Sequence, residues 1–187
     1  MKPISEFSGN KAEWIQPETS KRFFELQSGE TILATLSFRS MWGTFALAET
    51  ADGNWTFKRV GFLNPRVTVR VADQGQDLAI HTPKFWGDGI LSFQDGTSLS
   101  WKPINFWRTA WCFFDSNDGP LVDFHLGREK EKLSDILKTQ ATIEIHFLGA
   151  YRRWLPVLLP FGMYLLVLHQ EDSAAAVAAT SGASAAM

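Results

Sequence analysis

The sequence predicts a mainly β fold, a closed antiparallel barrel of about twelve strands around a buried hydrophobic C-terminal helix. Three observations lead to this fold class: short extended runs at intervals of about ten residues, Asp-Gly turn signals between them, and one long apolar segment near the C-terminus. No long helical pattern interrupts the extended runs, which argues against a parallel sheet with crossover helices. The 187 residues are enough for one domain with a sizeable core.

The extended runs are identified by their alternation. In Arg66–Val71 every second residue is valine and the others are polar, and Ile143, Ile145 and Phe147 alternate with polar residues in the same way. Side chains of a strand point to opposite faces, so this period of two predicts one buried and one solvent-facing side. Asp-Gly pairs suit the tight turns of β-hairpins, and they occur at Asp52-Gly53, Asp88-Gly89, Asp95-Gly96 and Asp118-Gly119.

The apolar segment Trp154–Leu168 has fifteen residues and no charge, and Arg152-Arg153 and Glu171-Asp172 flank it. A membrane span needs roughly 20 apolar residues, so this segment is short for one. The interior of a large barrel has to be filled, and a helix that is apolar around its whole circumference can fill it. We therefore favour a buried central helix, in which Gly162 lets a strand side chain approach closely. A membrane anchor is the alternative.

These patterns divide the chain into three parts. We expect residues 1–20 to be a loosely ordered lead and residues 21–172 to be the barrel domain, with its central helix near 151–170. The Ala- and Ser-rich residues 173–187 lack large side chains, and we expect them to be disordered. The segment Arg128–Gln140 fits either a short helix or turn or a twisted strand, and we favour the short helix or turn.

Several stretches together resemble the tubby C-terminal-like superfamily, and within it the scramblase-like and LURP-one-related branch. They are Asn54–Arg59, Arg66–Val71, Phe93–Gly96 leading to Trp101, and Ile143–Leu148 running into Trp154–Leu168. The resemblance covers roughly residues 22–170 and implies a twelve-stranded antiparallel barrel around a very hydrophobic C-terminal helix. It also implies a loose link to membranes or lipids.

The motifs that carry function in that superfamily are not found here. The lysine and arginine pocket with which tubby proteins bind phosphoinositides has no residue-by-residue match in this chain. The cysteine-rich palmitoylation cluster of scramblases is missing, because Cys112 is the single cysteine, and their calcium segment has no clear counterpart. The resemblance therefore predicts a fold more than a function.

The basic residues give the main functional hypothesis. Between Thr56 and Arg108 seven Lys or Arg residues occur with only four Asp or Glu, in a chain of net charge −2. Arg66 and Arg70 share the outward phase of one strand, so both project to the same side. We expect a non-enzymatic domain that binds anionic phospholipid headgroups or the inner membrane surface through outward cations. The candidate ligand-binding residues are Lys58, Arg59, Arg66, Arg70, Lys84, Arg152 and Arg153.

Other interpretations stay open beside this one. The basic residues are also consistent with ordinary solvated strand faces, and the domain with a protein-interaction or structural module that has no small ligand. Trp42, Trp86 and Trp107 lie near predicted loops and could form a platform for stacking sugars, as in a carbohydrate-binding barrel. The net charge gives no reason to expect nucleic-acid binding.

The sequence has no recognised catalytic or metal-binding motif. Asp115–Gly119 resembles the start of a calcium loop, but the glycine and the final glutamate are misplaced, so we interpret it as a hairpin turn. His81, His125, His146 and His169 occur singly, and alternation predicts that His125 and His146 are exposed. Cys112 lies between Trp111 and Phe113, where a thiol is usually inert packing. We expect no enzymatic activity, no cofactor and no metal.

The location of the protein is predicted from the same sequence. A single cysteine is consistent with a reducing compartment, and the first residues lack the apolar run of a secretory signal. We expect a cytoplasmic protein that is peripheral to the membrane when it binds lipid.

Overall fold

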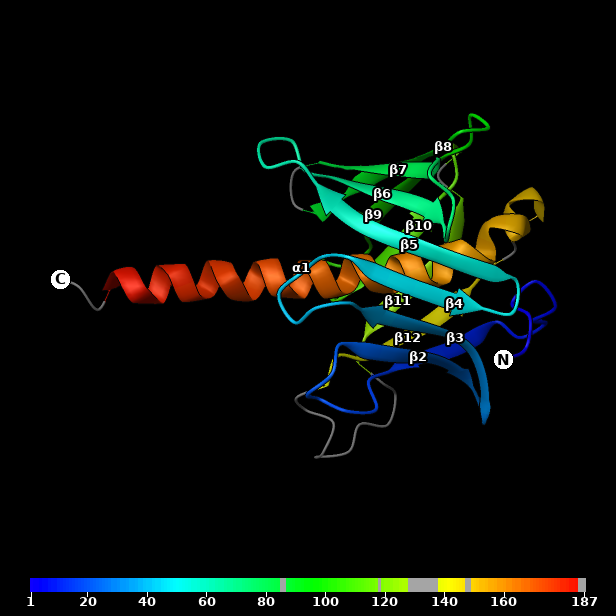
Figure 1. Ribbon diagram of the computed structural model, residues 1–187, viewed down its shortest axis with the longest axis horizontal. Helices are drawn as coiled ribbons and strands as arrows, with labels where there is room; N and C mark the ends of the chain where they lie inside the picture. The colour runs from blue at the N-terminus through cyan, green and yellow to red at the C-terminus, as the bar shows by residue number, and fades with distance from the viewer. Residues whose placement is uncertain (85–86, 118, 128–137, 147–148, 185–187) are drawn as a thin grey trace.

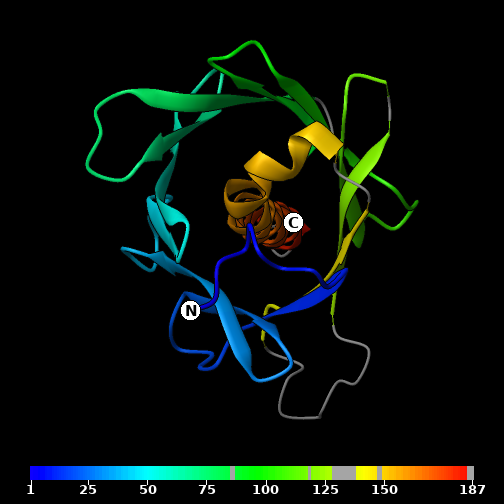
Figure 2. The same cartoon turned by 90° about the vertical axis from the view of Figure 1, so that its right-hand side faces the viewer.

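The computed structural model describes residues 1–84, 87–117, 119–127, 138–146 and 149–184. In this part of the chain twelve antiparallel strands close into a barrel, and the helix α1 (Leu155–Ser184) passes through its centre (Figures 1 and 2). Each strand pairs with the next along the chain, and the last pairs with the first. The predicted fold class is confirmed. Most of Arg128–Gln140, which we interpreted as a helix or turn, lies outside the described residues.

The strands follow one another in the order of the sequence. They are β1 (Lys11–Ile15), β2 (Phe23–Ser28), β3 (Thr31–Phe38), β4 (Ala46–Thr50), β5 (Gly53–Val60), β6 (Arg66–Val71), β7 (Asp77–Pro83), β8 (Gly89–Phe93), β9 (Ser98–Pro103), β10 (Ala110–Phe114), β11 (Pro120–Leu126) and β12 (Ala141–Ile145).

The N-terminal residues belong to the barrel, so the prediction of a loosely ordered lead over residues 1–20 was wrong. Strand β1 pairs with β2 on one side and with β12 on the other, and it closes the barrel. The side chains of Ile4 and Trp14 are fully buried, and the backbone N–H of Ile4 donates to Asp52 Oδ2 at 2.6 Å. Without β1 the edges of β2 and β12 would present unpaired backbone groups to solvent, which explains why a polar-looking segment is ordered.

The first half of α1 fills the barrel, which confirms the predicted buried helix. Every residue from Leu155 to Leu168 is buried, with at most 8% of its surface exposed. The ring of Phe161 packs against Phe57 with the ring centroids 5.2 Å apart, and the ring of Tyr164 stacks on Phe38 at 5.5 Å. The Tyr164 hydroxyl donates to the backbone oxygen of Thr44 at 2.7 Å, so its one polar atom is paired. The helix is thus a core element, surrounded by strands.

Two ion pairs hold α1 where it leaves the barrel. The Arg22 guanidinium lies 2.6 Å from Glu171 and 3.8 Å from the centre of the Phe38 ring. The Arg59 guanidinium makes two hydrogen bonds to the Asp172 carboxylate, at 2.6 and 3.1 Å. Arginine and carboxylate groups suit this bidentate geometry, which fixes position as well as adding energy.

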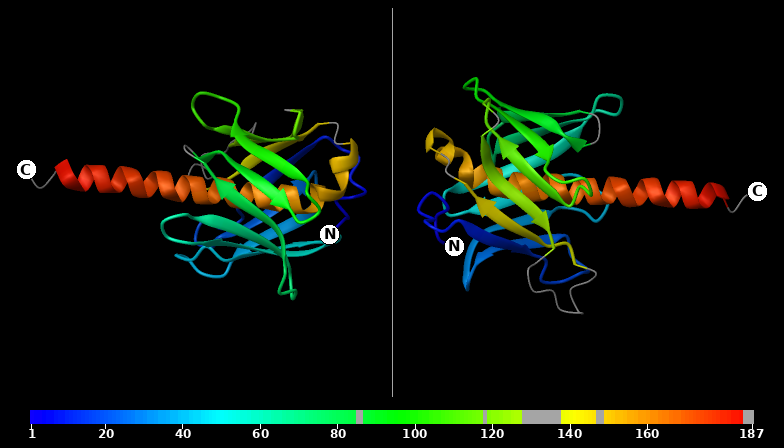
Figure 3. Two further views of the ribbon diagram at one scale, coloured as in Figure 1. Left: turned by 90° about the horizontal axis from the view of Figure 1, so that it is seen from above. Right: turned by 180° about the vertical axis from the view of Figure 1, so that it is seen from behind.

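Beyond these ion pairs α1 continues outside the barrel to Ser184 (Figures 1 and 3). We predicted residues 173–187 to be disordered, and the structure corrects this as far as Ser184. Alanine has the highest helix propensity, and a helix that is already nucleated inside the barrel extends at little cost. The side chains from Glu171 to Ala179 are exposed.

A substitution at the contact between Gly162 and Phe124 tests how closely the barrel wall packs against the helix. A Cβ atom on Gly162 would overlap the Phe124 ring, which is fully buried and packed against Trp101 and Phe113. We expect Gly162→Ala to lower the free energy of unfolding by about 1–3 kcal/mol, although alanine is intrinsically favoured over glycine in helices by about 1 kcal/mol. Urea unfolding followed by circular dichroism measures the change.

Phe124→Leu supplies the matched control, because it removes the atoms that Gly162→Ala would overlap. The double variant should lose less stability than the sum of the two single variants. Additive losses would show that the helix and β11 do not meet at this point.

Candidate functional site

The seven predicted basic residues lie in different parts of the barrel. Lys58, Arg66 and Arg70 project from the outer face of β5 and β6, where Lys58 pairs in register with Thr68, between the two arginines. The Arg70 guanidinium is paired with Asp77 at 2.5 Å. Arg59 was expected to point outward, but it lies on the inward phase of β5 and binds Asp172 on the helix. This hydrogen bond raises the pKa of the Arg59 guanidinium above its ordinary value.

Arg152 and Arg153 lie at the opposite end of the barrel, in a short 3-10 helix (Gly149–Trp154) that precedes α1. Arg152 donates to the backbone oxygen of Phe7 at 2.5 Å, and Arg153 pairs with Asp95 at 2.7 Å. The N-terminal segment crosses this end of the barrel (Figure 2). Both arginines therefore have structural partners, and they lie roughly 30 Å along the helix axis from Asp172.

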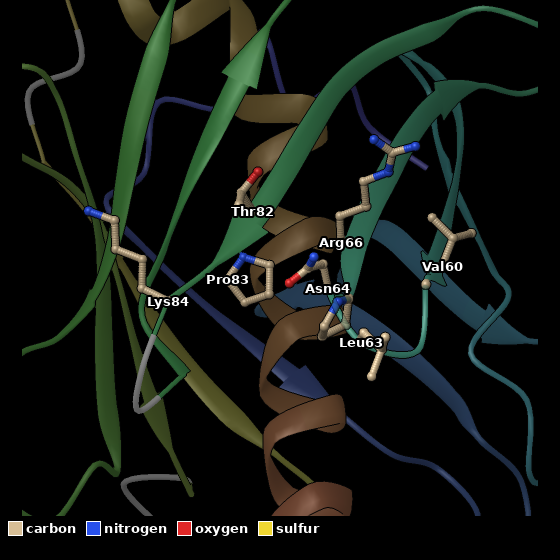
Figure 4. Close-up of a pocket in the computed structure, with 9 residues that line it drawn as sticks. Val60, Leu63, Asn64, Arg66, Thr82, Pro83 and Lys84 are labelled. Atoms are coloured by element: carbon tan, nitrogen blue, oxygen red, sulfur yellow. The ribbon is translucent and has the colours of Figure 1, made fainter.

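Arg66 and Lys84 are the two predicted cations that line the same cleft. They line an open cleft of about 1000 Å³ between the loop 61–65 and the end of β7, and they stand on opposite sides of it (Figure 4). Both are exposed, and neither has an ion-pair partner among the described residues. The cleft lies at the end of the barrel from which α1 emerges, which we call the exit end.

The exit end also carries most of the exposed apolar side chains. Nine large hydrophobic residues are exposed in the described part of the chain, and seven of them lie on the loops 39–45, 61–65 and 104–109 at this end. Trp42 and Phe62 have 96% and 97% of their surface exposed. A soluble surface rarely concentrates apolar groups in this way unless they meet a partner. We call these residues the apolar rim: Met41, Trp42, Phe62, Leu63, Ile104, Phe106 and Trp107.

The two ends of the barrel also differ in charge. Among the described residues the loops at the exit end hold six Lys or Arg and two Asp or Glu, and α1 adds Glu171, which pairs with Arg22, and Asp172, which pairs with Arg59. The segments at the opposite end hold three Lys or Arg and six Asp or Glu. The cations of the exit end are Lys21, Arg22, Arg39, Lys84, Arg108 and Lys138, and its acids are Glu18 and Asp88. The opposite end has Lys2, Arg152 and Arg153 with Glu6, Glu30, Asp52, Asp73, Asp95 and Asp115. The net charge of −2 for the whole chain does not reveal this unequal distribution of charge between the two ends.

A second, inner cavity of about 220 Å³ lies between α1 and the barrel wall at the exit end. Its walls include Val67, Trp101, Leu165 and Leu168, and its polar groups come from His81, Lys84, His169 and the Arg59–Asp172 pair. Pro65, Pro83 and Lys84 line both this cavity and the outer cleft, so the two spaces are adjacent.

His81 is the residue of this site that the sequence did not single out. Only 2% of its surface is exposed, and neither ring nitrogen has a hydrogen-bond partner within the described part of the chain. Burial lowers the pKa of His81 from 6.5 to about 4, so the ring is neutral at pH 7. Gly89 makes room for it, because a Cβ atom there would overlap His81 Nε2. We predicted a turn at Asp88-Gly89, but Gly89 is the first residue of β8 and the positive φ belongs to Gly87.

The remaining predicted sites have structural roles. Asp115 Oδ1 accepts hydrogen bonds from the backbone N–H groups of Asn117 and Gly119, as in a hairpin turn. Asp118 lies outside the described residues. His125 is exposed as predicted, whereas His146 is half-buried and lies 2.9 Å from Asp123. Over the described residues no three potential metal ligands lie close enough together to hold an ion.

The tryptophans that were predicted near loops are exposed where the structure describes them, and most of the others are buried. Trp42 and Trp107 are exposed on loops, and Trp14, Trp55, Trp101 and Trp111 are buried. Trp86 lies outside the described residues. Neither Trp42 nor Trp107 lines the outer cleft or the inner cavity.

Comparisons with protein-family models, curated proteins and solved structures find no match to this chain. Within the ranges that the structure describes, no helix combines the length and hydropathy that crossing a membrane requires. Function is therefore inferred from the exit end itself.

The buried imidazole of His81 makes stability depend on pH. The pKa is about 4 in the folded chain and near 6.5 in the unfolded chain, so the unfolded state takes up the proton first as the pH falls. We expect the free energy of unfolding to drop by about 2 kcal/mol from this group between pH 7 and pH 5. Urea unfolding of the wild type and of His81→Leu at both pH values measures it.

The variant has no imidazole at position 81, so its stability should fall less over this interval. Equal falls in the two proteins would mean that His81 is protonated as easily in the folded chain as in the unfolded one.

Proposed function

We propose that this protein binds the surface of membranes that contain anionic phospholipids, with the exit end of the barrel facing the membrane. The part of α1 that projects from this end (Figure 1) has no charged residue after Asp172, so it can enter the interface together with the loops. The observation that carries the proposal is that the apolar rim and the excess of cations occupy the same end. Either feature alone also occurs on proteins that bind no membrane, but together they match the two layers that a protein meets at a bilayer surface. Apolar side chains enter the boundary between headgroups and acyl chains, and cations remain among the headgroups.

The composition of the apolar rim supports this orientation. Trp42 and Trp107 have amphipathic rings of the kind enriched at membrane interfaces, and Phe62, Leu63 and Phe106 are fully apolar. Burying one such side chain contributes about 1.5–3 kcal/mol, so a few inserted residues suffice for reversible binding. Because the residues lie on loops, they can enter the interface without disturbing the core.

The outer cleft supplies a place for a headgroup phosphate. Arg66 and Lys84 stand on its two sides, and a phosphate between them would accept charge-assisted hydrogen bonds from both. Asn64 also lines the cleft and can donate through its amide. Lys58 and Arg70 lie on the side wall of the barrel, and Arg59, Arg152 and Arg153 have structural partners, so the proposed site keeps two of the seven predicted residues.

Other expectations about function stay predictions. They are the resemblance to the tubby-like superfamily, the absence of enzymatic activity, and a cytoplasmic location. A protein partner that covers the apolar rim in place of a membrane is the alternative that the experiments below would reveal.

Charge reversal at the cleft tests the headgroup site. We expect the protein to sediment with vesicles of phosphatidylcholine and phosphatidylserine and not with phosphatidylcholine alone. A cation near an anionic surface contributes about 1 kcal/mol, so Lys84→Glu or Arg66→Glu should each weaken binding by about tenfold or more. Vesicle co-sedimentation at a fixed salt concentration gives the affinities.

Lys2→Glu is the matched control, since it makes the same change of charge on an exposed lysine at the opposite end. At physiological salt the screening length is about 8 Å, so this variant should bind almost as well as the wild type. Equal weakening in all three variants would mean that only net charge matters, and the proposed orientation would be wrong.

The apolar rim is tested separately. Phe62→Ser and Phe106→Ser remove rings that are almost fully exposed, so neither should change the melting temperature. We expect each to weaken vesicle binding by about tenfold, from the lost burial of one aromatic ring. Unchanged vesicle affinity, together with capture of a stable protein partner that the same variants lose, would favour the alternative.

A further inference from the structure

The inner cavity at the exit end has the composition of a ligand site for a small molecule. Leu165 and Leu168 of α1 form one wall, and Val67 and Trp101 of the barrel face them. At about 220 Å³ the cavity is smaller than the roughly 300–1000 Å³ of pockets for drug-sized ligands, so its ligand is small. Small-molecule sites are typically apolar with a few placed polar groups, and this cavity has both.

His81 supplies the first polar group, and it is the observation that points to a ligand. Its neutral ring has one N–H donor and one nitrogen acceptor, and both lack a partner among the described residues. A buried polar group without a partner is costly, and proteins rarely keep one without a use. The imidazole packs with Nε2 against Gly89, where a Cβ atom would overlap it, so Gly89 lets the ring reach this position. His81 therefore lines the cavity with a ring whose hydrogen-bonding capacity is unused.

Lys84 supplies the second polar group, at the entrance. It has no ion-pair partner within the described ranges, whereas Arg59 at the same cavity is neutralised by Asp172. The backbone pairing of β6 and β7 reaches no further than Val67 and His81, so these strands are not bonded to each other beyond that point. Pro65, Pro83 and Lys84 line both the outer cleft and the inner cavity there, which gives a path from the surface. Figure 4 shows α1 behind the cleft.

We propose that the inner cavity binds a small amphiphilic carboxylate that carries a second, uncharged polar group. The carboxylate pairs with Lys84 at the entrance, the apolar body lies against Leu165 and Leu168, and the uncharged group completes the hydrogen bonds of His81. Lys84 follows His81 by three residues, which is about 10 Å between their Cα atoms in extended backbone. A chain of about eight carbons spans that length. The site shares Lys84 with the proposed headgroup cleft, but it binds a soluble ligand without a membrane and does not depend on the membrane proposal.

Titration calorimetry without vesicles, at pH 7, tests the site with two probes. We expect 8-hydroxyoctanoate to bind about tenfold more tightly than octanoate, because only the hydroxyl can reach a hydrogen bond with His81. His81→Leu should make the two affinities equal. In ¹⁵N NMR spectra the ring signals of His81 should move with 8-hydroxyoctanoate and not with octanoate, which a purely structural histidine would not show.

Further variants separate this site from the membrane surface. Leu165→Phe fills the cavity from the helix and should abolish binding of both probes, while vesicle binding stays unchanged. Lys84→Met should weaken both probes, whereas Lys58→Met, on the outer wall of the barrel, should weaken neither. The proposal is overturned if neither probe binds at millimolar concentration, which would mean that the cavity holds water only. Equal affinity of the wild type for the two probes would overturn it as well.

Discussion

The structure depends on the mutual burial of α1 and the barrel wall. A helix that is apolar from Leu155 to Leu168 could not remain in water, and a twelve-stranded barrel without it would enclose a space that its own side chains do not fill. The wall accommodates the helix unevenly. Inward positions on β4 carry the small residues Ala46 and Ala48, whereas β9, β10 and β11 carry Trp101, Phe113 and Phe124. Gly162 meets the bulky side at Phe124, so the residue sizes of helix and wall are matched.

The simple order of the strands explains why the two ends of the barrel differ. Each strand pairs with its neighbours in sequence, so successive loops alternate between the two ends. Turns with aspartate, such as those at Asp52 and Asp95, fall at one end, and the loops of the apolar rim fall at the other. Cations and exposed apolar side chains therefore gather at one end of the molecule, although the overall composition of the chain does not indicate it.

The sequence predicts the barrel and its central helix because both leave periodic signals, but it does not predict which residues meet. In β7 the apolar phase is Leu78 and Ile80, yet Ala79 and His81 face the interior. The neighbouring helix decides this: Phe161 already occupies the space in front of His81, so this part of the wall has to be small or flat. Arg59 was misassigned for a related reason, since its partner Asp172 is 113 residues away. The rim tryptophans were placed on loops correctly because loops follow from turn signals.

The exit end is also the place where the interior can exchange a ligand with solvent. The opposite end is covered by Ile4 and Phe7, which are buried, and Arg152 fastens that segment to the start of the helix. Along α1 the sequence changes from apolar to polar after Leu168, so polar groups first meet the interior at His169 and Asp172. An imidazole without hydrogen bonds would destabilise the fold if it lay against the middle of the buried part of α1. At the boundary near Leu168 a ligand or water can reach it. The change from apolar to polar residues on α1 therefore explains why the proposed ligand site lies at this end.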